Sequence, residues 1–189
     1  MSDIKVLGMC GSLRKGSYNR MALNVAAKMA LTHEGATYTE ANLKELNLPI
    51  YDGDIEAQGF PSGVVELKRL VADSDIILIA SPEYNHSITP ALKNAIDWLS
   101  RDVNTLDKKW VVLFGVSIGV YGTVRGQTHL RQILTALNAY VLPQPQVLIK
   151  NSEQAFLPDG SLSDKMVEKG LNKLITDTVV MVRKVKTNS

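Results

Sequence analysis

Residues 75–81 read DIILIAS, and this nearly unbroken apolar run decides the fold class. A strand that is apolar at successive positions is covered on both faces, as in a parallel sheet flanked by helices. The next segment, TPALKNAIDWLS at 89–100, repeats its apolar residues with helical spacing. Thr89 is a suitable N-cap for it, and Pro90 fits the first helical position. Its buried stripe is predicted to comprise Leu92, Ala95, Ile96 and Leu99.

The same alternation of strand and helix extends in both directions from this unit. Further strands are predicted at residues 4–9, 36–43, 110–116 and 146–150. Further helices are predicted at residues 19–32, 61–72 and 130–137, and from Ser161 toward the C-terminus. Asn19 is a plausible N-cap, and Asp164 follows Ser161 by three residues as in a capping box. The stretch 48–63 is rich in Pro, Gly and Asp and predicts neither helix nor strand.

The C-terminal helix presents one mostly apolar face to the rest of the protein. That face is predicted to comprise Val167, Leu171, Leu174, Ile175, Thr178 and Val182. Five strands alternating with helices indicate an α/β fold with a doubly wound five-stranded parallel sheet, order 2-1-3-4-5, and helices on both faces. Ligands in such sheets bind at the carboxyl ends of the strands, where the strand order reverses. The loops after residues 9, 81 and 116 are therefore the ones that should carry function.

Composition excludes several classes of protein. The chain has 189 residues, of which 45% are hydrophobic and 21% charged, which fits one globular domain over residues 1–189. Its 21 basic and 19 acidic residues are scattered and give a net charge of +2, so no nucleic-acid partner is expected. No apolar run approaches the ~20 residues of a membrane span, and no signal-peptide layout is present. We therefore expect a cytoplasmic protein without a membrane span.

Cysteine and histidine usage predicts neither a disulfide nor a metal site. Cys10 is the single cysteine, at a strand end, and is interpreted as a small core residue. The three histidines, His33, His86 and His129, are far apart in the sequence and lack metal-ligand spacing.

The first of these loops, GSLRKGSYN at 11–19, comes after a strand and opens a helix. Backbone N–H groups at a helix start bind anions, and Ser12, Ser17 and Asn19 add neutral hydrogen-bonding groups. Arg14 adds a forked, charge-assisted contact, so the composition suits a terminal phosphate. Leu13 stands where the dinucleotide fingerprint G-x-G-x-x-G needs its second glycine, and no P-loop lysine is present. The alternative is a Gly/Ser-rich turn that only caps a helix.

The second loop suits a flat, polar-edged ligand, and the third allows close approach of its backbone to a ligand. In SPEYNHS (81–87), Tyr84 offers a flat face, Asn85 a donor and an acceptor, and Pro82 a stiff backbone. In SIGVYGT (117–123), glycines let the backbone approach a ligand, and its N–H groups can stabilise negative charge. Each loop alone also fits an ordinary connection between strand and helix.

Four motifs together resemble the NADPH-dependent FMN reductase family of flavodoxin-like proteins, in its branch of quinone, azo-dye and chromate reductases. They are GSLRKGSYN (11–19), PEYN (82–85), LKNAIDWLSR (92–101) and HLRQIL (129–134), and their order and spacing match as far as about residue 150. The resemblance implies an FMN-binding site in the first loop at Ser12, Arg14, Lys15, Gly16, Ser17, Tyr18 and Asn19, with the phosphate on Ser12, Arg14, Ser17 and Asn19. It implies isoalloxazine contacts at Pro82, Glu83, Tyr84, Asn85, Ser117 and Gly119. Tyr121 departs from the small residue that many relatives carry before Gly122.

The resemblance also implies a reaction. NADPH or NADH would transfer a hydride to FMN, which would then reduce a small quinone-like acceptor by two electrons in a ping-pong scheme. Free flavin, azo dyes, chromate or ferric complexes are further acceptors of this branch. No catalytic side chain is required, and relatives are homodimers or homotetramers with the flavin near a subunit interface.

Two alternatives remain open at this point. The first is a flavodoxin-like electron carrier without a substrate of its own, although carriers are usually strongly acidic and this chain is +2. The second is a flavin-free regulatory module that senses a nucleotide or a partner.

Overall fold

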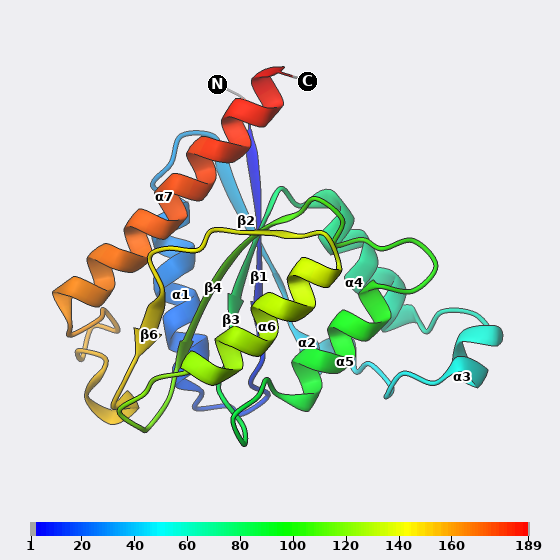
Figure 1. Ribbon diagram of the computed structural model, residues 1–189, viewed down its shortest axis with the longest axis horizontal. Coiled ribbons are helices and arrows are strands. Elements are labelled where there is room, and N and C mark those ends of the chain that lie inside the picture. Colours follow the sequence, from blue (N-terminus) through cyan, green and yellow to red (C-terminus); the bar gives the residue numbers. More distant parts are fainter. Residues whose placement is uncertain (1–2, 189) are drawn as a thin grey trace.

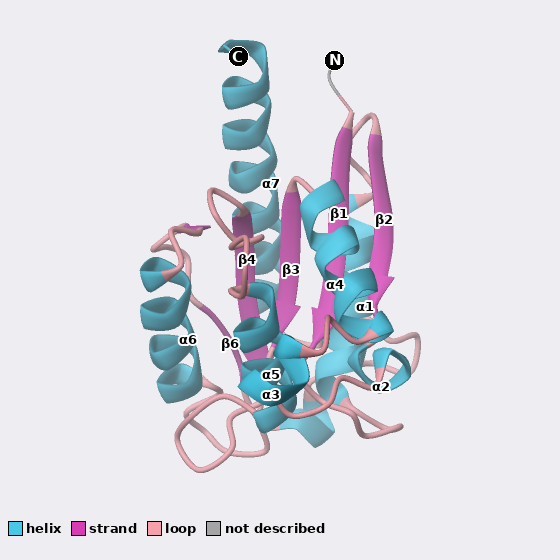
Figure 2. Cartoon of the chain, turned by 90° about the vertical axis from the view of Figure 1, so that its right-hand side faces the viewer, coloured by secondary structure: helices cyan, strands magenta, loops and turns pink. Residues whose placement is uncertain are grey.

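The computed structural model describes residues 3–188, and its strands form one parallel sheet. The strands are β1 (Ile4–Cys10), β2 (Ala36–Ala41), β3 (Ile76–Ala80), β4 (Trp110–Val116), β5 (Tyr140–Val141) and β6 (Val147–Ile149). Their order is β2-β1-β3-β4-β5, with β6 also paired to β4, which confirms the predicted topology. The strands point toward one end of the molecule, away from both termini (Figure 2).

The fifth position of the sheet is shared by two short strands, of which the sequence predicted only the second. Trp110 at the start of β4 pairs with Tyr140 of β5, and Phe114 further along pairs with Val147 of β6. Pro143 and Pro145 lie between the two short strands. Because proline has no N–H to donate to a neighbouring strand, it breaks the pairing there.

Helices cover both faces of the sheet (Figure 1). They are α1 (Tyr18–Ala30), α2 (Leu43–Leu46), α3 (Gly53–Ala57), α4 (Ser62–Asp73), α5 (Pro90–Leu99), α6 (Val124–Ala136) and α7 (Lys165–Asn188), with a 3₁₀ turn η1 at Ser152–Gln154. The buried side chains of α1 and α7 share one core, and those of α4, α5 and α6 share the other. None of the helices within residues 3–188 is long and apolar enough to cross a lipid bilayer.

Strand β3 shows why its sequence is apolar at every position. Ile76, Leu78 and Ala80 belong to the core beneath α1 and α7, whereas Ile77 and Ile79 belong to the core beneath α4–α6. The four residues predicted to form the buried stripe of α5 are buried, as are five of the six predicted on α7. The sixth, Val167, is partly buried against the same core. Hydrophobic periodicity thus identified the inner faces of both helices.

Three helix starts differ from the predicted ones. The N-cap of α1 is Ser17 and not Asn19, because Ser17 Oγ accepts a hydrogen bond from Arg20 N at 3.3 Å. Helix α6 begins at Val124, six residues before the predicted start, since its first two turns carry polar residues that give no apolar period. Helix α7 begins at Lys165 and not near Ser161. Asp164 is itself the capping group, with Oδ1 accepting from Met166 N at 2.8 Å.

The stretch 48–63 was wrongly predicted to hold no element, because α3 forms within it; α2, just before it, was also missed. Tertiary contacts stabilise this segment where local periodicity is lacking. Trp98 of α5 donates its indole N–H to Pro49 O at 2.8 Å, and Asn94 Oδ1 accepts from Tyr51 N at 2.8 Å. Five-residue helices are marginal in isolation, and α3 itself buries no residue, so these contacts hold the chain that leads into it.

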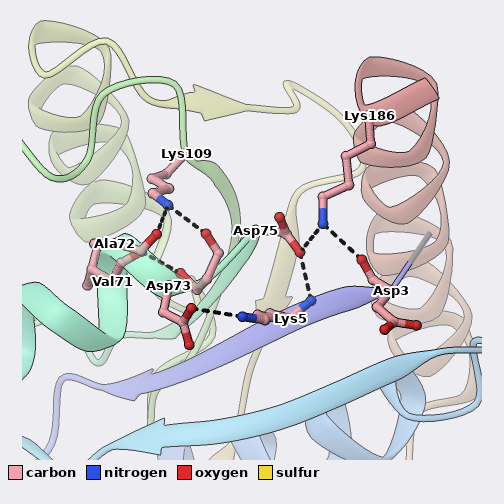
Figure 3. A network of polar contacts seen from close by, with 9 residues as sticks. Asp3, Lys5, Val71, Ala72, Asp73, Asp75, Lys109 and Lys186 are labelled. Atoms are coloured by element: carbon pink, nitrogen blue, oxygen red, sulfur yellow. Dashed lines mark hydrogen bonds and ion pairs between the residues drawn. The ribbon is translucent and has the colours of Figure 1, made fainter. Parts of the chain in front are cut away.

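A network of lysines and aspartates closes the end of the sheet where the strands begin (Figure 3). Lys186 of α7 donates to Asp75 Oδ2 at 2.7 Å and to Asp3 O at 2.8 Å. Lys109 donates to two carbonyls at the end of α4 at 2.6 and 2.7 Å. These contacts hold α7 and α4 against the end of the sheet that is remote from the three predicted loops. The network therefore stabilises the fold and takes no part in the site.

Candidate functional site

The three predicted loops meet around a cavity of about 230 Å³ at the carboxyl ends of the strands. It lies where the sheet order reverses between β1 and β3, the usual ligand position in this architecture. Its walls are Ser12, Arg14, Ser17, Tyr18 and Asn19 from the first loop, Pro82, Glu83 and Tyr84 from the second, Val116, Ser117 and Ile118 from the third, and Ser152.

The first loop wraps the N-terminus of α1. The side chains of Ser12 and Ser17 are buried, and Arg14 is exposed. Two hydrogen bonds fix the backbone at the start of the loop: Gly11 N donates to Ala80 O at 2.9 Å, and Thr89 Oγ1 donates to Gly11 O at 2.6 Å. A 13-residue helix directs its unpaired N–H groups and the positive end of its dipole at this point. The arrangement can hold an anion such as a phosphate monoester.

Asn19 has a structural task at this site. Its Nδ2 donates to Val116 O and its Oδ1 accepts from Val116 N, both at 2.9 Å and buried. The last paired residues of β3 and β4 are Ala80 and Phe114, so Val116 extends beyond the end of β3. The amide therefore takes the place of a neighbouring strand and joins the first loop to the third. One amide N–H remains for a ligand.

The second loop ends in a tight turn. Tyr84 N donates to Ser87 O at 2.9 Å, and Ser87 N donates back to Tyr84 O at 3.0 Å. Asn85 and His86 between them have φ angles of +49° and +66°. Positive φ at both central residues is the signature of a type I′ turn. The turn leaves Tyr84 half exposed at the rim and places Asn85 at the tip, outside the cavity walls.

Glu83 anchors the second loop to α6. Its Oε2 accepts hydrogen bonds from Arg125 N and Gly126 N, both at 2.9 Å, in the first turn of that helix. The side chain is only 11% exposed, and the negative charge sits at the positive end of the helix dipole. The guanidinium of Arg125 lies 3.8 Å from Glu83 Oε1 and 5.0 Å from the centre of the Tyr121 ring. Glu83 therefore fixes the backbone on which Tyr84 sits.

The third loop is held by the end of β6 and by η1. Ser117 N donates to Ile149 O at 3.0 Å, and Ser117 O accepts from Ser152 N at 3.1 Å. Ser117 Oγ accepts from Gly119 N at 3.2 Å, although Gly119 itself does not line the cavity. These bonds orient the strand end toward the cavity.

Not every residue implied by the resemblance lies on the cavity wall, and some wall residues were missed. Asn85, Gly119, Lys15 and Gly16 lie outside it; Lys15 lines a neighbouring hollow together with Arg14. Val116, Ile118 and Ser152 were not anticipated. Ser152 could have been found, because Asn-Ser at 151–152 comes soon after the predicted fifth strand, as the other loops come after theirs.

Close to the first loop, an aromatic side chain fills the space above a glycine. A Cβ on Gly8 would lie 2.1 Å from the hydroxyl oxygen of Tyr38, so only glycine fits beside this ring. Burial raises the pKa of Tyr38 to about 12, although the nearby charge of Arg20 acts in the opposite direction. Arg20 forms an ion pair with Glu40. The thiol of Cys10 is buried in the same core, in agreement with its interpretation as a small core residue.

Comparisons with known proteins place this geometry in a family. Residues 4–154 match the family model described as NADPH-dependent FMN reductase. The chain is 38% identical over 185 residues to an NAD(P)H-dependent FMN reductase of Pseudomonas aeruginosa, covering 97% of this chain and 98% of that protein. It is 37% identical over 187 residues to an NAD(P)H:quinone oxidoreductase of Solanum tuberosum, covering 97% and 95%. Among solved structures, FerB, a flavoenzyme NAD(P)H:(acceptor) oxidoreductase from Paracoccus denitrificans, superposes with a TM-score of 0.84 at 32% identity, covering 96% and 98%.

Proposed function

Because the chain belongs to the NADPH-dependent FMN reductase family, we propose that it is an FMN-dependent NAD(P)H:acceptor oxidoreductase that reduces quinones. One observation carries the proposal: an anion-binding helix start, an aromatic rim and a polar strand end surround one cavity at the switch point of the sheet. A flavin mononucleotide needs these three kinds of contact, for its phosphate, its ring face and its ring edge. The chain would act as a single flavodoxin-like domain over residues 1–189.

The donor set fits FMN. Ser12, Ser17 and Arg14 flank the start of α1, where hydroxyls, backbone N–H groups and a guanidinium suit the phosphate. Tyr84 is a flat, half-exposed side chain of the second loop, and Ser117 offers a polar backbone on the wall formed by the third loop. The cavity is smaller than the roughly 300–1,000 Å³ of ordinary ligand pockets, so part of a bound flavin would face solvent. A hydride donor and an acceptor could then use the same open face in turn.

The chemistry does not call for a catalytic side chain. FMN, when bound, would supply hydride and two-electron transfer between NAD(P)H and the acceptor. The chain's own residues bind and orient: Asn19 and Glu83 hold the loops in place. The backbone N–H of Ile118, a wall residue, would offer a fixed dipole to developing negative charge.

The acceptor and the assembly are further parts of the proposal. We assign a quinone-like small molecule as acceptor, because quinone reductases are among the relatives of near-full-length coverage. We assign a homodimer or homotetramer, supported by large apolar side chains exposed beside the cavity: Ile118 (82%), Val120 (62%) and Tyr121 (64%). A cytoplasmic location completes the assignment, since reducing conditions there suit a chain whose single cysteine is a free thiol.

The test is a visible absorbance experiment on the purified chain. The spectrum is recorded with added FMN, after anaerobic NADPH or NADH, and again after a quinone is added. We expect a flavin spectrum that bleaches with the nicotinamide nucleotide and returns with the quinone. Light scattering on the same sample gives the oligomeric state.

Each rival predicts a different outcome. Bound flavin that neither NADPH nor NADH bleaches would indicate an electron carrier and refute the reductase. A chain that takes up no FMN at micromolar concentration would indicate a flavin-free module. The matched variant Arg14→Ala should weaken FMN binding more than riboflavin binding, because riboflavin lacks the phosphate that Arg14 is proposed to contact.

A further inference from the structure

Ser152 carries a hydroxyl that the protein leaves without a partner. The residue is 2% exposed, and its Oγ is shielded from solvent and forms no hydrogen bond. In the described part of the chain the other buried side chains with an unpartnered polar atom are Tyr38, Gln127, Arg131 and Arg183. None of these four lines the cavity between the three loops, whereas Ser152 does.

Backbone contacts, rather than the hydroxyl, hold Ser152 at this wall. Its N–H donates to Ser117 O at 3.1 Å, and its carbonyl accepts from Ala155 N at 3.3 Å. The 3₁₀ turn is further closed by Gln154 N, which donates to Asn151 O at 2.8 Å, and by Ser163 Oγ, which donates to Gln154 O at 2.6 Å. The position of the residue therefore does not depend on its side chain.

A buried hydroxyl without a partner destabilises a protein by its lost hydration, commonly by about 1–3 kcal/mol. Such a group is explained when a ligand supplies the missing partner. The hydroxyl proton rotates freely and can be directed at whatever occupies the cavity. From its place on the wall and its unused hydrogen-bonding capacity, we propose that Ser152 is a flavin-binding residue that donates a hydrogen bond to the polar, pyrimidine edge of the ring.

The assignment to the ring, and not to the phosphate, rests on the layout of the walls. The proposed phosphate contacts Ser12, Ser17 and Arg14 surround the start of α1. Ser152 is bonded through its backbone to Ser117, on the wall formed by the third loop. Carbonyl and ring-nitrogen acceptors of the pyrimidine edge suit a hydroxyl donor. This inference rests on the proposed function, since it assumes that the ligand is FMN.

The variant Ser152→Ala separates a ligand contact from a structural role. Because Oγ has no protein partner, the flavin-free variant should melt at the same temperature as the unmodified chain, or higher. Its dissociation constant for FMN, from flavin fluorescence titration, should rise about three- to tenfold, the effect of losing one neutral hydrogen bond. Ser74→Ala is the matched control, because Ser74 is also buried but donates to Val71 O at 2.9 Å, remote from the cavity. That control should melt lower and keep its FMN affinity.

Riboflavin and a second variant make the result decisive. A contact to the ring predicts the same fold loss for riboflavin as for FMN, whereas a loss confined to FMN would overturn the ring assignment. Ser152→Cys fills the space with a slightly larger side chain and a weaker donor, and it should bind FMN with intermediate affinity, which covers the case in which the alanine variant fails to fold. If both variants bind FMN as tightly as the unmodified chain, the inference is wrong and the proposed function stands. If the unmodified chain binds no FMN, the proposed function itself fails.

Discussion

The change Asn19→Ala tests the way the site is built. Asn19 satisfies both backbone groups of Val116 with two buried hydrogen bonds of 2.9 Å. Alanine leaves a buried N–H and a buried carbonyl without partners, at about 1–3 kcal/mol each before any water enters. We expect a total loss of about 2–4 kcal/mol, because water entry offsets part of the two penalties. At roughly 2–4 °C per kcal/mol for a domain of this size, the melting temperature should fall by about 5–15 °C.

The assay is thermal and urea unfolding of the flavin-free chain, with FMN titration as the second step. Asn172→Ala is the control, because Asn172 is exposed on α7 and alanine is the better helix former, so its stability should stay the same or rise slightly. Asn19→Asp isolates the donor, since a carboxylate can accept from Val116 N but, when ionised, cannot donate to Val116 O. It should also lower stability.

The flavin-free measurement is the discriminating one. If Asn19 acted only as a phosphate ligand, its removal would weaken FMN binding and leave the unfolding transition unchanged. A melting temperature within about 2 °C of the unmodified chain would therefore refute the reasoning that Asn19 replaces a strand beside β4.

Three further changes give outcomes that the same instruments can check. Glu83→Ala removes the acceptor of two N–H groups at the start of α6 and should lower the free energy of unfolding in urea by about 1–3 kcal/mol. Glu83→Gln should lose less. Equal stability of the alanine variant and the parent would contradict the anchoring role. Tyr38→Phe should leave stability at pH 8 unchanged or raised. The unfolded Tyr38 loses its proton near pH 10 and the folded one near pH 12, so its native stability falls as the pH rises through this window. The Phe variant should therefore gain about 1 kcal/mol over the parent at pH 11, and parallel pH profiles would show that the hydroxyl is not buried. Gly115→Ala places a Cβ 2.2 Å from Ser81 O, a backbone atom, and should lower the free energy of unfolding by about 3 kcal/mol or more, as in severe overpacking. An unchanged melting temperature would show that the ends of β3 and β4 can separate.

The sequence by itself determined the sheet, its order and the inner faces of its long helices. The apolar run of β3 and the stripe of α5 are local patterns, and each reports burial directly. Parallel strands bring their carboxyl ends to one end of the sheet, so the residues directly after each strand were enough to indicate the loops at 11–19, 81–87 and 117–123. Helix starts were less well predicted, because a polar first turn such as that of α6 carries no apolar period.

The tertiary structure alone decided what each polar side chain does there. Asn19 bonds the backbone of a strand 97 residues away, and Glu83 caps a helix 42 residues away; neither contact has a local signature. The segment before α3 is held by Trp98 and Asn94 of α5, at Pro49 and Tyr51, and no local sequence window could reveal these contacts. Ser152 joined the wall because η1 folds back onto Ser117. Local patterns encode burial, whereas the partner of a polar group depends on where distant segments come to lie.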